Sequence, residues 1–170
     1  MENTRALKMP IETIRSLINV EREWENKQQT NSYAYALGLD IPEEKIKSYA
    51  YTPGNLSNCE IDLSHYNSFT YELLMYNIAH DLEALGIEAK EVLPEEEVEE
   101  DAWKIALFYT GYKSNICDYH FLRQLKDGTW THKNGSKIYT RDDFFRIIKS
   151  PETCFLMGRH YDKCLSLKLR

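Results

Sequence analysis

Hydrophobic residues recur at helical spacing in the first half of the chain and alternate with polar residues in much of the second half. Apolar positions from Ile11 to Trp24 follow a period of three to four residues, which predicts a helix ending near Asn26. The stretch from Phe69 to Leu85 has the same period, and Gly86 is placed to end it. The pattern therefore predicts two longer helices, both before the middle of the chain.

A polar turn and a short run of small and aromatic residues lie between these helices. Thr30 or Asn31 can cap a helix over residues 33–37, and Gly38 suits its C-terminal end. Residues 41–63 contain the turn sequence Thr52-Pro53-Gly54-Asn55 and little periodicity. We expect irregular structure there.

The second half is rich in β-prone segments. Strands are predicted over residues 87–93, 103–109, 118–125, 129–133 and 164–169, and Lys126-Asp127-Gly128 is a good hairpin turn. Asp142 or Asp143 is expected to cap a short helix over residues 144–148. Because helices lead and strands follow, the predicted fold class is α+β, with N-terminal helices packed on a mostly antiparallel sheet.

Composition narrows the class of protein. A chain of 170 residues with 42% hydrophobic content predicts one domain over 1–170, in which 1–29 form the N-terminal helix and connector and 30–170 the core. The net charge of −6 argues against nucleic acid and anionic membranes as partners. No signal-like or membrane-length apolar stretch occurs, so we expect a cytoplasmic protein; delivery elsewhere as an effector or phage protein stays open.

Cysteine and histidine positions give little sign of a metal site. The four cysteines have no zinc-ligand spacing, which predicts free thiols and no metal or other cofactor. Two histidines, His120 and His132, straddle the predicted hairpin turn at an even separation. In a register that closes around Asp127 they share one face and lie opposite each other or on a diagonal. Asp118 has the same parity, so a base and the group that orients it are expected here.

Several short motifs resemble a poorly characterised group of bacterial and phage proteins. They are Asn31-Ser32-Tyr33-Ala34-Tyr35-Ala36, Pro53-Gly54, Asp118-Tyr119-His120-Phe121 with Arg123, and Trp130-Thr131-His132-Lys133-Asn134-Gly135 followed by Asp142. The order of these parts is similar to that of the papain-like cysteine peptidases and amidases, including the CHAP amidases. The resemblance spans residues 30–145 and implies a papain-like fold with a cysteine at the start of the first core helix.

The chain departs from that group at one position, because Ser32 stands where the group has cysteine. Three explanations stay open: a Cys-to-Ser change that quiets the site, a genuine serine nucleophile, and a natural relative that binds without cleaving. We favour the first, since every neighbour of Ser32 fits the group.

The resemblance implies a thiol hydrolase of peptide or amide bonds, weakened in this Ser32 form, with a protein or peptide as its substrate. Position 32 would be the nucleophile and His120 the general acid/base, oriented by His132 or Asp118; a shift of register would exchange the two histidines. The oxyanion would bind the N–H of residue 32, helped by Asn31, Gln28 or Gln29. We assign substrate binding to Tyr35, Tyr119 and Trp130.

A non-catalytic module is the alternative from another class. In it the histidines are structural, and tyrosines together with the acidic run at 94–101 bind a basic protein. The oligomeric state, and the choice between hydrolysis, deamidation and acyl transfer, are open at this level.

Overall fold

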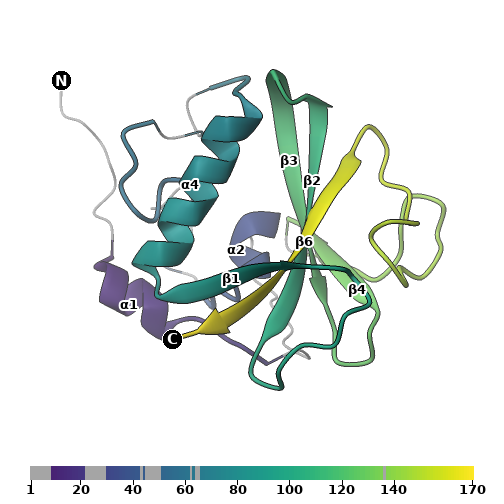
Figure 1. The fold of residues 1–170 in the computed structure, drawn as a ribbon, viewed down its shortest axis with the longest axis horizontal. Helices are drawn as coiled ribbons and strands as arrows, with labels where there is room; N and C mark the ends of the chain where they lie inside the picture. Colours follow the sequence, from purple (N-terminus) through teal and green to yellow (C-terminus); the bar gives the residue numbers. More distant parts are fainter. Residues whose placement is uncertain are drawn as a thin grey trace.

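An antiparallel sheet of six strands, in the order β1-β6-β2-β3-β4-β5, organises the fold (Figure 1). The structure is a computed structural model, and it describes residues 9–21, 30–42, 44, 51–61, 63, 66–135 and 137–170. The strands are β1 (Ile87–Val92), β2 (Trp103–Tyr112), β3 (Asn115–Gln124), β4 (Trp130–Asn134), β5 (Lys137–Tyr139) and β6 (His160–Leu169). The predicted α+β class with an antiparallel sheet is therefore confirmed.

Helices α1 (Ile11–Ser16), α2 (Ser32–Ala36) and α4 (Tyr71–Ala84) contribute to the core on one face of the sheet. The larger core cluster joins their apolar side chains to alternate residues of the central strands, such as Trp103, Ile105 and Phe121. Side chains of opposite parity, including Phe108, Leu122 and Trp130, form a second cluster on the outer face. That cluster is covered by the segment between β5 and β6, through Ile148 and Leu156.

Helix α4 lies within the predicted range 69–85 and ends before Gly86, as predicted. The Thr70 side chain accepts the N–H of Leu73 at 3.2 Å, and Gly86 follows the helix with a φ of 67°. Its buried face carries Asp81, which accepts hydrogen bonds from the Tyr33 hydroxyl, the Gly54 N–H and Ser57. This carboxylate ties the Pro53-Gly54 turn to α2 and α4.

Two helix predictions are wrong. The first helix ends at Ser16, because Ile18 forms a β-bridge with Leu39 and Asn19 donates its N–H to the Gly38 carbonyl. Residues 22–29, where this helix was expected to end, lie outside the described part. No helix forms over 144–148 within the described residues; turns occupy this segment, and Phe145 has a φ of 60°.

The acidic stretch 94–101 is a loop, as expected, and packs against the β1–β6 end of the sheet. The buried Lys104 ammonium donates to the carbonyl oxygens of Pro94 and Glu96, at 2.5 and 2.6 Å. All four cysteines are free. None of the helices in the described ranges is long and apolar enough to cross a bilayer.

Candidate active site

The two hairpin histidines meet on the outer face of the sheet. In the β3–β4 register Leu122 lies opposite His132, so His120 and His132 are diagonal neighbours, one of the two arrangements that the sequence predicts. His120 Nε2 lies 3.0 Å from His132 Nδ1, and the rings are nearly perpendicular, at 79°. The two imidazoles form one hydrogen-bonded unit.

The backbone carbonyl of Arg141 extends this series of hydrogen bonds. His132 Nε2 lies 3.2 Å from the Arg141 carbonyl oxygen, which can only accept a hydrogen bond. In a neutral His132 the proton therefore sits on Nε2, and Nδ1 accepts from His120 Nε2–H. A neutral His120 then carries its proton on Nε2 and keeps an unprotonated Nδ1, which is the lone pair that a general base needs.

Burial favours the neutral form of both rings. Desolvation, helped by the nearby positive charges of Arg159 and His132, lowers the pKa of His120 from about 6.5 to about 3. Desolvation also lowers the pKa of His132, partly offset by its bond to the Arg141 carbonyl. The hydrogen-bonded pair is therefore uncharged near neutral pH.

Ser32 contacts the backbone of β3 next to this unit. The β3–β4 ladder ends at Leu122, and Phe121 donates its N–H to Ser32 Oγ at 3.2 Å. Ser32 is buried, and its hydroxyl contacts the amide of the residue that directly follows His120. No hydrogen bond joins Ser32 to either histidine among the described contacts, a separation seen in many unliganded active sites.

The local sequence explains why position 32 is held there. The Asn31 side chain accepts the N–H of Ala34 at 2.8 Å and donates to the Tyr51 carbonyl at 2.6 Å, which caps α2 and fixes it to the following segment. Both polar atoms of the Asn31 side chain are thereby used. Ser32 is the first helical residue, and its own N–H has no acceptor in the described part of the chain. This amide is available to bind an oxyanion.

The structure places Asp118 apart from this unit. Its carboxylate faces Arg159 at 3.9 Å, and within the described contacts it has no bond to a histidine. Of the two groups proposed to orient His120, His132 is the one in contact. Gln28 and Gln29, suggested as oxyanion donors, lie outside the described residues.

The three residues assigned to substrate binding lie mostly in packed surroundings. Tyr35 is buried, and its hydroxyl lies 2.6 Å from that of Thr131. Trp130 is buried in the outer cluster, and Tyr119 packs its half-buried ring against Phe121. Tyr35 and Trp130 hold the hairpin in place and do not form a surface groove.

Three residues that contribute to the candidate site were not predicted from the sequence. Arg141 acts through a carbonyl oxygen, for which a sequence carries no side-chain signal. Arg159 acts through a positive charge whose position depends on how β6 packs. Tyr139 stacks on His132 with centroids 5.5 Å apart, and the turn at Asn134-Gly135 before β5 was the available signal for its strand.

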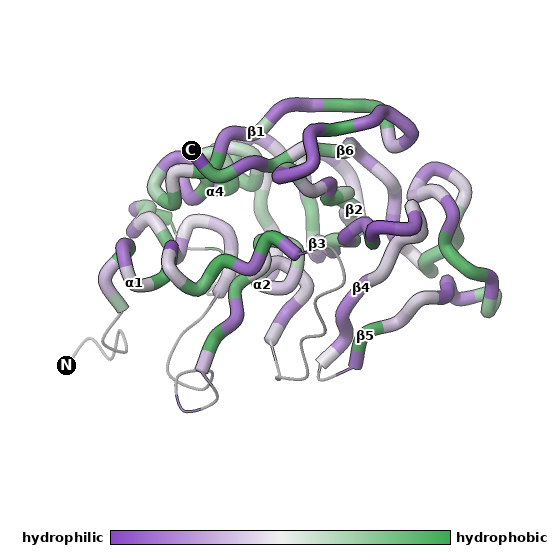
Figure 2. The backbone as a smooth tube through the Cα atoms, turned by 90° about the horizontal axis from the view of Figure 1, so that it is seen from below, coloured by the Kyte–Doolittle hydropathy of each residue, from purple (hydrophilic) through white to green (hydrophobic). Residues whose placement is uncertain are grey.

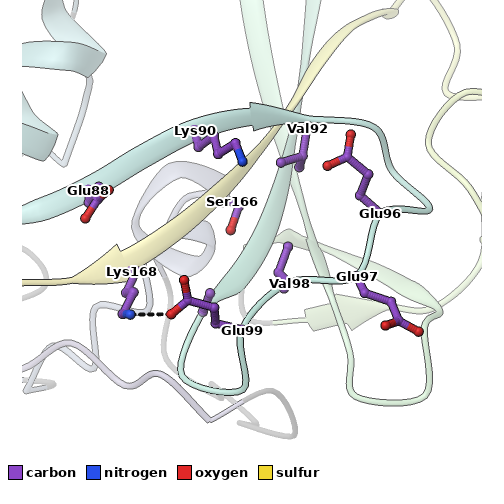
Figure 3. A pocket seen from close by; sticks show the side chains of 10 residues that line it. Glu88, Lys90, Val92, Glu96, Glu97, Val98, Glu99, Ser166 and Lys168 are labelled. Atoms are coloured by element: carbon purple, nitrogen blue, oxygen red, sulfur yellow. Dashed lines mark hydrogen bonds and ion pairs between the residues drawn. The ribbon is translucent and has the colours of Figure 1, made fainter.

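Two hollows lie on the described part of the surface, and neither is lined by Ser32, His120 or His132. One, of about 180 Å³, lies where the acidic loop meets β1 and β6, and glutamates surround it together with Lys90 and Lys168 (Figure 3). The other, of about 450 Å³, is lined by residues between Asp142 and Cys154. Among the described residues, no group of three His, Cys, Asp or Glu is placed to hold a metal ion. The candidate site is therefore identified by its side chains and their hydrogen bonds, and not by a surface pocket.

Comparison with known proteins gives the chain no relatives from which to borrow a function. No protein-family model, curated protein or solved structure matches it. The functional argument therefore depends on the geometry of Ser32, His120 and His132.

Proposed function

We propose that this protein is a hydrolase of peptide or amide bonds of the thiol type, with position 32 as the nucleophile and His120 as its base. The substrate would be a protein or peptide. The order of parts, with a helix-borne nucleophile before a histidine on the sheet, agrees with the papain-like resemblance, which remains part of the proposal.

The observation that carries the proposal is the chain of hydrogen bonds ending at Arg141. The Arg141 carbonyl orients His132, and His132 in turn orients His120 with its Nε2 proton directed at His132 Nδ1. His120 Nδ1 is the nitrogen left to receive a proton from a nucleophile. Burial leaves the ring neutral, so the Nδ1 lone pair is unprotonated; the same burial lowers the pKa of His120 to about 3, which makes the ring a weaker base than an exposed histidine.

The proposed reaction runs in two steps. His120 Nδ1 takes the proton from the group at position 32, which attacks the substrate carbonyl carbon, and the oxyanion binds the N–H of residue 32. When this tetrahedral intermediate collapses, the bond between the carbonyl carbon and the amine breaks, and the amine leaves with the proton from His120. Water then attacks the acyl-enzyme, His120 takes its proton, and the acid is released as the proton returns to position 32.

Serine at position 32 would make this reaction slow. A thiol has a pKa of about 8.5 and is a good nucleophile once ionised, whereas a hydroxyl stays protonated until a base removes the proton during attack. Within the described structure His120 and Ser32 do not share a hydrogen bond, so His120 is not positioned in this state to remove the hydroxyl proton. We therefore propose that the Ser32 form is inactive or weakened.

A module that binds a basic partner is the second candidate. Its supporting observation is the hollow among Glu88, Glu96, Glu97 and Glu99 (Figure 3). Lys168 of the same chain already pairs with Glu99 and Asp101 there. Because this internal pairing neutralises part of the patch, we favour the hydrolase.

Alkylation tests the proposal directly. Ser32→Cys protein is treated with iodoacetamide between pH 5 and 9, and labelling at each cysteine is followed by peptide mass analysis. Burial raises the pKa of Cys154 to about 11 and that of Cys164 to about 12, so these thiols should stay nearly silent. Exposed Cys117 serves as the ordinary thiol in the same molecule.

We expect the introduced thiol to react well below pH 8 and faster than Cys117, and His120→Ala to remove that advantage. Labelling no faster than at Cys117 would refute the thiol-hydrolase proposal and favour the binding module. A fluorophosphonate probe on the unchanged chain examines the serine alternative. Covalent labelling of Ser32 would show that serine itself is a working nucleophile.

A further inference from the structure

The segment between β4 and β6 lies at the end of the molecule remote from α1 (Figure 2). Several of its large apolar side chains are exposed. Phe145 is 82% exposed, Met157 74% and Phe144 59%. The Phe144 ring stacks on Phe155 with centroids 4.2 Å apart. We call the following set the aromatic platform: Tyr139, Phe144, Phe145, Ile147, Phe155 and Met157.

The platform is held rigidly by one buried carboxylate. Asp142 accepts hydrogen bonds from the N–H groups of Phe144, Arg146 and Phe155 and from the Arg146 guanidinium. Phe145 is kept in a left-handed conformation, at a φ of 60°, while Arg141 donates to its carbonyl oxygen at 2.9 Å. A strained backbone that presents an aromatic ring to water is unfavourable by itself, which is typical of a functional surface.

This surface is continuous with the candidate active site. Tyr139 stacks on His132, and the Arg141 carbonyl that orients His132 belongs to the same turn as Asp142. Ile147 forms a β-bridge with Arg141. A chain bound at His120 and His132 could therefore place a neighbouring side chain on the platform.

Charge indicates what kind of group would bind. Between residues 139 and 157 the cations Arg141, Arg146 and Lys149 are balanced by three anions, Asp142, Asp143 and Glu152. A balanced surface has no net attraction for an anionic lipid headgroup or for a strongly charged peptide. Aromatic rings offer a large contact area to a neutral apolar side chain.

We propose that the aromatic platform is a substrate subsite that binds an apolar side chain, aromatic or branched aliphatic, of the polypeptide to be cleaved. This inference rests on the proposed hydrolase function and adds the class of residue that the enzyme selects. Rigid aromatic side chains lose little freedom on binding, so the platform provides selectivity without closure of a lid.

A small probe tests the platform without a known substrate. N-acetyl-phenylalaninamide and N-acetyl-glycinamide are titrated into isotope-labelled protein, and NMR shifts are followed in residues 139–157 and in the His132 ring. We expect the phenylalanine compound to bind at least tenfold more tightly than the glycine compound. Phe144→Ser and Phe145→Ser should each weaken it severalfold, whereas the control Tyr112→Ser, which removes a 79% exposed tyrosine at the distant end of β2, should not.

A second measurement connects the platform to the nucleophile. In Ser32→Cys protein, saturating N-acetyl-phenylalaninamide should slow iodoacetamide labelling of the introduced thiol severalfold, and this protection should vanish in the Phe145→Ser background. Binding that leaves the labelling rate unchanged would overturn the subsite, even if the thiol is activated. A thiol no more reactive than Cys117 would instead refute the hydrolase itself, so the two failures are distinguishable.

Two further outcomes would overturn the inference. Equal affinity for both amides, or equal weakening by Tyr112→Ser, would mean that the platform does not select apolar side chains. Co-sedimentation with vesicles of equimolar phosphatidylcholine and phosphatidylglycerol that depends on Phe145, with no response to the amides, would assign the surface to a lipid bilayer.

Discussion

Two imidazoles and one carbonyl oxygen define the candidate site at the scale of single residues. Among the four nitrogens of these two rings, the described hydrogen bonds leave only His120 Nδ1 with a free lone pair. Removing His132 would let His120 rotate and exchange tautomers. The contribution of His132 is therefore orientation of His120, and it should show in the rate of proton transfer.

In the Ser32→Cys background, we predict that His132→Ala slows alkylation of the introduced thiol at pH 6 by between about 10-fold and 100-fold, the range seen when groups that orient a metal-ligating histidine are lost. His132→Gln keeps a carbonyl oxygen that can accept from His120 Nε2 and should recover part of the rate. His80→Ala, on the exposed face of α4, is the control. Equal rates for both His132 variants would contradict the orienting role.

Burial of His120 also predicts how stability depends on pH. An unfolded histidine has a pKa of about 6.5, whereas in the folded state burial lowers the pKa of His120 to about 3. Between these values the unfolded chain binds a proton that the folded chain does not. Stabilisation by the neutral ring is therefore complete above about pH 6.5 and falls as pH decreases toward 3, at up to ~1.4 kcal/mol per pH unit.

Urea unfolding at a series of pH values measures this slope. We expect His120→Gln to flatten the decline below pH 6.5, with exposed His80→Gln leaving it as it is in the unchanged chain. Parallel curves for His120→Gln and the unchanged chain would show that His120 has the same pKa in the folded and unfolded states.

At the scale of elements, the turn around Asp142 replaces the helix that its sequence suggests. Asp142 does accept the N–H groups of Phe144 and Arg146, as a helix cap would. It also accepts the N–H of Phe155, which draws the chain across the outer face of the sheet. Because of this hydrogen bond to Phe155 and the left-handed conformation of Phe145, the segment does not continue as a helix.

We predict that Asp142→Asn destabilises the fold by about 1–3 kcal/mol, because an amide leaves buried donors without a charged acceptor. Although burial by itself raises the pKa of Asp142, these hydrogen bonds lower it to about 2. The loss should therefore be present above about pH 4 and shrink as pH falls toward 2. Urea unfolding measures it, with exposed Glu152→Gln as the control; equal midpoints for both variants would contradict the role of Asp142.

The turn at Pro53-Gly54 gives a second test at this scale. Gly54 and Gly128 both have positive φ, of 95° and 90°, but a Cβ at Gly54 would lie 2.4 Å from Asn77 Nδ2, whereas at Gly128 it would meet open space. Gly54→Ala should therefore lower the free energy of unfolding by at least about 1 kcal/mol more than Gly128→Ala. Equal losses in urea unfolding would mean that the turn moves freely away from α4.

At the scale of the whole molecule, Arg123 connects the sheet to segments far away in the chain. Its buried guanidinium donates to the carbonyl oxygens of Tyr35, Asn19 and Glu21 and lies over the ring of Trp103. These bonds hold α2, and with it Ser32, against β3. Burial lowers the pKa of Arg123 only to about 10, so the group stays charged near neutral pH.

We predict that Arg123→Lys lowers the free energy of unfolding by about 2–3 kcal/mol, since one ammonium cannot reach the three carbonyls that a planar guanidinium spans. Exposed Arg170→Lys is the control. In the Ser32→Cys background the same change should also slow alkylation, because α2 loses its anchor. A loss of stability with an unchanged labelling rate would show that α2 is held independently of Arg123.

Local pattern predicted most elements correctly. Helix α4, strands β1, β2 and β6 and the β3–β4 hairpin follow from periodicity and turn residues, because each element buries one face of its own side chains. The same parity placed His120 and His132 on one face. The short strand β5 and the extended start of β6 lie beyond what alternation over a few residues can indicate.

The amino-acid sequence by itself thus determined the α+β class and the shared face of the two histidines, since both follow from alternation along a strand. Only the tertiary structure decided that the first helix ends at Ser16, that Asp142 builds a turn, and that His120 is the ring left with a free nitrogen. Each of these depends on a backbone group or a carboxylate bonding to a distant segment: Ile18 with Leu39, Asp142 with Phe155, and His132 with Arg141. Every residue carries the same backbone donors and acceptors, so their partners become visible only when the chain is folded.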